Sequence, residues 1–155
     1  MVDPLTREAV IEEACLLAAT QPGGTLASMH AEDGTPYVTF VLFHLRPNGE
    51  VVFGSGQGPQ HSRNMLATPE VSFLIDNREV IRSEWTGFNR VVIEGTAEVV
   101  EAGSADYATL LAELGAKNKM AAYFTERGLL FRLRPRRLIL MKGFEPTRHM
   151  VDFGG

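Results

Sequence analysis

The segment VVFGSGQGPQHSRNMLA, residues 51–67, contains an apolar strand, a loop rich in glycine and hydroxyl groups, and the start of a short helix. Backbone N–H groups of such a loop and of a helix N-terminus bind anions, and an arginine adds a planar pair of donors. Ser55 and Ser62 flank the loop and Arg63 follows it, so this pattern predicts a phosphate site. The alternative is a solvated loop in which Ser62 caps the helix and Arg63 points into water.

Alternating apolar residues and turn signals on both sides of this segment predict an antiparallel β-structure. Asp33-Gly34 is typical of a hairpin turn, Asn48-Gly49 of a second one, and Gly95 inside a long strand indicates a bulge or bend. Six strands are expected: residues 25–31, 37–45, 51–54, 71–75, 90–100, and a last extended stretch of residues 129–133 and 137–141 around Pro135.

Helices are expected outside this sheet. The first covers about residues 4–20, and its apolar stripe consists of Val10, Ala14, Leu17 and Ala18. Ser104 is expected to cap a later helix, which ends or bends at Gly115 and continues over residues 117–125. The hairpin connections favour a mainly β fold, a six-stranded antiparallel β-barrel with peripheral helices, over a parallel βαβ sheet.

Length and composition narrow the class of protein. A chain of 155 residues is expected to form a single domain over residues 1–155, with a barrel over about residues 24–142 and a tail over residues 143–155. A net charge of −4 argues against nonspecific nucleic-acid binding, and no apolar run is long enough for a membrane span. Cys15 is the only cysteine, and no cluster of His, Asp or Glu has metal-site spacing. A cytoplasmic protein is expected.

The predicted strand at residues 37–43, YVTFVLF, is apolar at nearly every position. A strand with one face in water alternates apolar and polar residues, so this one is expected to be covered on both faces. One cover is the core. The second is a helix, a flat apolar ligand or another subunit.

Four segments share their order and spacing with a known family. They are residues 33–39 (DGTPYVT), residues 61–72 (HSRNMLATPEVS), residues 90–97 (RVVIEGTA), and residues 131–135 (FRLRP) followed by Gly143-Phe144. Over about residues 20–148 the chain therefore resembles the pyridoxamine 5'-phosphate oxidase-like, FMN-binding split-barrel family.

This resemblance implies a homodimer with FMN sites at the subunit interface. The isoalloxazine ring would lie along Val38, Thr39, Phe40 and Val41. The phosphate would be bound by Ser55, His61, Ser62 and Arg63, with His61 at a position where many members have lysine. Arg90 would reach the flavin from the partner subunit.

The resulting hypothesis is an FMN-dependent oxidoreductase that acts on a small organic substrate. No catalytic residue is named, because the cofactor carries the chemistry. Phe43 replaces the lysine with which oxidases of this family hold pyridoxamine phosphate, so this substrate is not expected. Alternatives are a haem-binding or haem-degrading protein with His149 or His61 as ligand, a non-catalytic flavin carrier or sensor, and a deazaflavin in place of FMN. A histidine as near the C-terminus as His149 is otherwise typically solvated.

Overall fold

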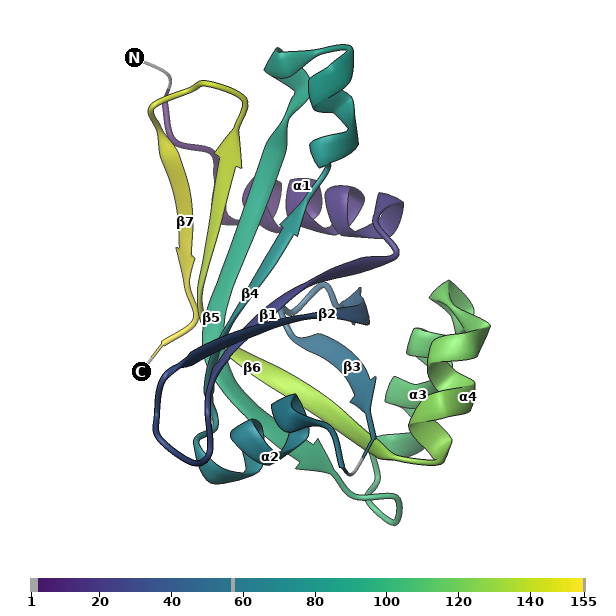
Figure 1. Cartoon of the computed structure of the whole chain (residues 1–155). Helices are drawn as coiled ribbons and strands as arrows, with labels where there is room; N and C mark the ends of the chain where they lie inside the picture. Colours follow the sequence, from purple (N-terminus) through teal and green to yellow (C-terminus); the bar gives the residue numbers. More distant parts are fainter. Residues whose placement is uncertain (1–2, 57, 155) are drawn as a thin grey trace.

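A computed structural model describes residues 3–56 and 58–154 and shows a closed antiparallel barrel with helices around it (Figure 1). The sheet order is β3-β2-β1-β4-β5-β6-β7, and an additional pairing of β3 with β6 closes β1 to β6 into a six-stranded barrel. The strands are β1 (Gly23–Met29), β2 (Pro36–Leu45), β3 (Val51–Ser55), β4 (Glu70–Asp76), β5 (Asn89–Val100), β6 (Leu129–Lys142) and β7 (Arg148–Asp152). The fold predicted from the sequence is confirmed.

The barrel splits along the long strand β6. The first part of β6 pairs with β3, and its second part pairs with β7, while β5 follows both parts. The register between β5 and β6 shifts between Glu94 and Gly95, opposite Pro135, which confirms the predicted irregularity at Gly95. The strand β7 lies in the tail expected over residues 143–155 and extends the sheet beside β6, which the sequence does not predict.

In the part of the chain that the structure describes, four α-helices surround the barrel: α1 (Arg7–Thr20), α2 (Gln60–Ala67), α3 (Tyr107–Lys117) and α4 (Lys119–Glu126). Two short 3₁₀ turns cover Arg78–Arg82 and Trp85–Gly87. The predicted stripe of α1 is confirmed, because the same four residues are the buried ones. Within the described residues, no helix is both long enough and apolar enough to cross a membrane.

The late helices differ from the prediction. Ser104 is not a cap, because its hydroxyl donates to the carbonyl of Glu101, and α3 begins only at Tyr107. Gly115 does not end the helix, which continues to Lys117. The break comes at Asn118, whose side chain accepts a hydrogen bond from the Ala121 N–H and so caps α4.

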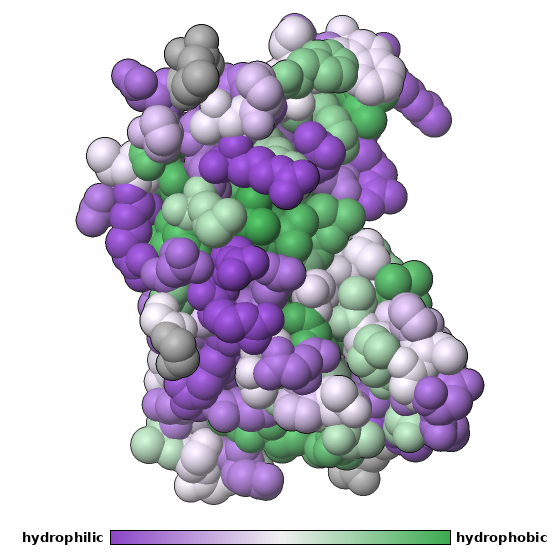
Figure 2. Space-filling model, turned by 90° about the vertical axis from the view of Figure 1, so that its left-hand side faces the viewer, coloured by the Kyte–Doolittle hydropathy of each residue, from purple (hydrophilic) through white to green (hydrophobic). Residues whose placement is uncertain are grey.

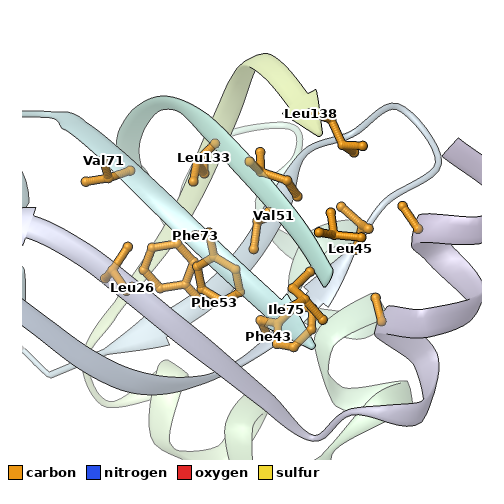
Figure 3. Close-up of a cluster of buried hydrophobic side chains, with 14 of the residues drawn as sticks. Leu26, Phe43, Leu45, Val51, Phe53, Val71, Phe73, Ile75, Leu133 and Leu138 are labelled. Carbon is orange, nitrogen blue, oxygen red and sulfur yellow. The ribbon is translucent and has the colours of Figure 1, made fainter. Parts of the chain in front are cut away.

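Aromatic rings fill the interior of the barrel (Figure 3). The rings of Phe43 and Phe53 lie 5.1 and 6.2 Å from that of Phe73, and all three side chains are fully buried. A second apolar cluster packs α3 and α4 against the outer side of β3 through Val52 and Leu114. The strand β3 is therefore buried on both faces.

Figure 2 shows the side of the molecule where β7 lies, on which hydrophilic residues border an apolar patch. The arginines of β6 are paired with acids of neighbouring strands. Arg134 donates to Glu98 at 2.7 Å, and Arg136 donates to Glu70 at 2.9 Å. Arg134 and Arg136 therefore have acidic partners within the chain.

Candidate functional site

A pocket of about 270 Å³ opens between β2, the end of β3, the start of α2, and α4. Its β2 wall includes Phe40 and Val41, and Ser55 and His61 contribute polar groups. The opposite wall is formed by α4, through Phe124 among others. Segments that lie far apart in the sequence thus meet at the loop that the sequence singled out (Figure 1).

Three polar side chains converge at one end of this region. The Ser55 Oγ lies 2.6 Å from the His61 Nε2 and also contacts the Ser62 Oγ. The Ser62 hydroxyl donates to the carbonyl of Gly56 at 2.5 Å. Ser62 is fully buried inside the first turn of α2 and makes no capping bond, so the alternative that it is an ordinary helix cap is wrong.

The position of α4 depends on Gly54 in β3. A Cβ atom at Gly54 would lie 1.7 Å from the Thr125 Oγ1, so only glycine lets the helix pack this closely on the strand. The Thr125 hydroxyl donates back to the Ala121 carbonyl at 2.6 Å, which keeps this buried polar group satisfied. The sequence does not predict this wall of the pocket, because the need for glycine at position 54 comes from its contact with Thr125, which is distant in the sequence.

His61 is the titratable group of the pocket. Burial lowers the pKa of its imidazole below the ordinary value of 6.5, because desolvation disfavours the charged form. The side chain is therefore neutral near pH 7 in the free protein. A phosphate placed beside it would favour the protonated form and raise this pKa.

The structure places Arg63 on the outer side of α2. Its guanidinium donates to the Gly58 carbonyl at 2.7 Å, contacts Gln60, and lies 3.5 Å from the Glu32 carboxylate. Arg63 does not line the pocket in this arrangement. The neighbouring Asn64 is fully buried instead and ties α2 to the end of β1 by accepting from the Ala31 N–H.

The outer face of β2 is only partly covered. Val38 and Phe40 are each 65% exposed, whereas Leu42 packs against the cluster under α3 and α4. Within this chain, the expectation of two covered faces therefore holds only for the second half of the strand. Thr39 lies between the exposed pair and is half-buried.

Arg90 lies apart from this pocket, at the start of β5, where its backbone is opposite Asp76 of β4 in the sheet. Its guanidinium lies 5.4 Å from the ring of Phe88, and its buried Nε has no hydrogen-bond partner among the described residues. Trp85 stacks on Phe144 close by in sequence, with ring centroids 5.9 Å apart. The chain alone does not bring Arg90 to the other predicted site residues.

His149 is buried, and the expectation of a solvated side chain is wrong. Its Nδ1 accepts a hydrogen bond from the Leu5 N–H at 3.1 Å, and its Nε2 lies 3.5 Å from the Glu145 carboxylate. The backbone donor fixes the tautomer, so the proton is on Nε2. The Nδ1 contact ties the tail to the N-terminal segment, and His61 is the histidine that lines the pocket.

The chain matches the model of the family described as pyridoxamine 5'-phosphate oxidase over residues 11–140. It belongs to this family. The match covers most of the chain, including β1 to β5, with Ser55 at the end of β3 and His61 and Ser62 at the start of α2. No curated protein matches the chain in sequence.

Several solved structures are similar to this chain in fold. A haem-binding protein from Mycobacterium smegmatis is 25% identical, with a TM-score of 0.80 over 96% of this chain, which spans about 60% of that protein's length. HutZ, the haem storage protein from Vibrio cholerae, is 21% identical with a TM-score of 0.68, over 84% of this chain and 92% of HutZ. An FAD-binding protein from Mesorhizobium loti is 17% identical, with a TM-score of 0.67 over 89% of this chain and 95% of that one.

We expect the pKa of His61 in the free protein to lie below 6.5, because burial favours the neutral imidazole. The unfolded chain then binds more protons than the folded one, so this residue makes the protein less stable as the pH falls through about 6.5. An NMR titration of the imidazole measures the pKa, with His61→Gln to assign the signal. A value at or above 6.5 would contradict the burial argument.

Proposed function

We propose that this member of the pyridoxamine 5'-phosphate oxidase family is a homodimeric FMN-binding oxidoreductase that acts on a small organic substrate. The observation that carries the proposal is the meeting of a hydroxyl and imidazole cluster with an uncovered apolar strand at one pocket. FMN joins a phosphate to a flat apolar ring and needs both kinds of surface.

The chemistry of Ser55, His61 and Ser62 fits a phosphate. Each group can donate a hydrogen bond, and within the cluster they have mainly each other and the Gly56 carbonyl as acceptors. Hydroxyl groups rotate to suit a new acceptor, and phosphate oxygens supply several. Arg63 follows directly in α2, and its contact with the exposed Glu32 is a weak surface pair that a phosphate can replace.

The exposed half of β2 fits the ring. Phe40 borders the pocket, and Val38 continues the same outer face of the strand. Val41 lines the pocket as well, and Thr39 lies between Val38 and Phe40 in the strand. A flat ligand laid along Val38–Val41 would remove this apolar surface from water, which is favourable by about 25 cal/mol per Å².

A second copy of the chain would cover the rest of the exposed face of β2. The exposed apolar side chains of β2 lie near those of α4, where Met120 is 55% and Phe124 is 61% exposed. Exposed apolar groups gathered in this way mark interaction surfaces. Arg90 and its unpartnered Nε would then reach a flavin held mainly by the other subunit.

FMN supplies electron or hydride transfer when bound. The chain's own residues then have three tasks: the Ser55 cluster fixes the phosphate, β2 orients the ring, and α4 limits the access of water. None of these tasks requires a general acid or base, so no catalytic residue is assigned. Phe43 lies fully buried inside the barrel, which supports a substrate other than pyridoxamine phosphate.

A haem-binding function is the second candidate, favoured by the similarity to the Mycobacterium smegmatis haem-binding protein. His61 would be the ligand, because imidazole binds haem iron and His149 is held inside the fold. His61 would have to exchange its hydrogen bond with Ser55 for the metal.

The absorption spectrum of the natively purified protein separates the two candidates, together with the mass of any released cofactor. We expect the two visible flavin bands and the mass of FMN. A Soret band with the mass of haem would favour the second candidate. A colourless protein that binds no added FMN would contradict the proposal.

Replacing Arg63 with alanine tests the phosphate contact. We expect Arg63→Ala to weaken FMN binding by about 1.5–3 kcal/mol, the usual contribution of a charged hydrogen bond, as measured by quenching of flavin fluorescence. Arg82→Ala removes the same charge from an exposed 3₁₀ turn and serves as the control. Equal affinities of the two variants would leave Arg63 as a surface residue paired with Glu32.

A further inference from the structure

A second cleft of about 430 Å³ lies between α1, the end of β2, and α3. It shares no lining residue with the pocket beside Phe40. Its walls are largely apolar, with Ala18 from α1, Leu45 and Pro47 from β2 and the following turn, and Ala116 from α3. Its volume is within the range typical of small-molecule sites.

Lys117 lines this cleft at the C-terminal end of α3. Its Nζ is shielded from solvent and has no hydrogen-bond partner within the described residues. The Nζ lies 3.6 Å from the centroid of the Phe43 ring. Burial lowers the pKa of the amine to about 8. The ring and the helix dipole favour the ammonium, but neither accepts a hydrogen bond as an oxygen does.

The charged groups around Lys117 leave it without a counter-ion. Glu113 is the acid of the cleft, and it already accepts a hydrogen bond from Arg46 at 2.9 Å. Burial lowers the pKa of His44, which makes this imidazole neutral near pH 7. Cys15, facing from α1, is likewise neutral, because burial raises the pKa of its thiol. The ammonium of Lys117 is therefore the unbalanced charge of the cleft.

A second apolar groove adjoins the cleft. Both are lined by Cys15 and Pro47, and the groove continues over Ile11 and Leu16 on the exposed side of α1. Leu16 is 64% exposed. Glu8 and Glu12 border the groove, so its outer end repels a second negative charge. The two cavities together favour a ligand with one anionic end and an apolar body.

From these observations we propose that the cleft between α1 and α3 binds a small organic carboxylate, and that the Lys117 ammonium turns from its shielded position over the Phe43 ring into the cleft to pair with the carboxylate group. The apolar body lies against Leu45 and Pro47 and extends toward Leu16. The carboxylate supplies the acceptors that the buried Nζ lacks, which offsets the cost of keeping a charged amine out of water. A phosphate, with its higher charge, would need more cations than this cleft offers.

The site has a defined pH dependence. The carboxylate binds the protonated form of Lys117. Its affinity is therefore expected to fall as the pH rises through about 8, the pKa of the Lys117 amine in the unliganded protein. Of the other groups facing the site, His44 at the end of β2 and Cys15 on α1 stay neutral from pH 7 to 8, because burial lowers the pKa of the imidazole and raises that of the thiol. Arg46 at the end of β2 and Glu113 on α3 are hydrogen-bonded to each other. Lys117 therefore dominates the change in that range.

Octanoate, below its micelle-forming concentration, is a suitable probe for calorimetric titration of the full chain. We expect saturable binding at pH 7 that becomes about tenfold or more weaker in Lys117→Met, by the usual contribution of a charged hydrogen bond. Lys119→Met removes an exposed lysine and is expected to bind like the wild type. Octan-1-ol has the same apolar body without the charge. We expect its affinity for the wild type to be no higher than the affinity of octanoate for Lys117→Met.

An NMR titration of the Lys117 side chain in the wild type tests the same proposal without any substitution. Octanoate is expected to raise the pKa of Lys117, because it stabilises the ammonium. Equal binding of octanoate and octan-1-ol, an unchanged Lys117 pKa, or no binding would overturn the proposal. Displacement of FMN by octanoate would also overturn it, since the ligand would then occupy the pocket beside Phe40.

Discussion

The pairing of β3 with β6 closes the barrel, and the geometry of the candidate site depends on it. Val51 lies opposite Leu133, and the register runs down to Ser55 opposite Leu129. Both faces of β3 are buried, one in the aromatic core and the other under α3 and α4. The end of the strand is thereby fixed, and with it the point where the chain turns into α2.

Two surfaces with different chemistry meet at that point. The end of β3 and the start of α2 bring Ser55, His61 and Ser62 together, and β2 leaves Phe40 exposed at the same pocket. Solved structures of a haem-binding protein and of an FAD-binding protein share this fold, so the fold alone does not decide the ligand.

Much of the fold could be predicted because its signals are local. Gly34 and Gly49 have φ values of 73° and 87°, as the two turns require, and the stripe of α1 follows helical spacing. Contacts between distant segments could not be predicted in this way. Arg63 contacts Glu32, and the Leu5 N–H donates a hydrogen bond to His149; both contacts join distant parts of the chain. The sequence pointed to the loop after β3 and to a helix over residues 117–125, but not to the position of this helix as a wall of the pocket.

Comparing FMN with riboflavin tests the central claim most directly, because the two share a ring and only FMN carries the phosphate. The account predicts that the wild type binds FMN more tightly than riboflavin, and that Ser62→Ala reduces this difference while leaving riboflavin affinity unchanged. Equal affinity of the wild type for both ligands would contradict it. So would an equal loss of both affinities in Ser62→Ala.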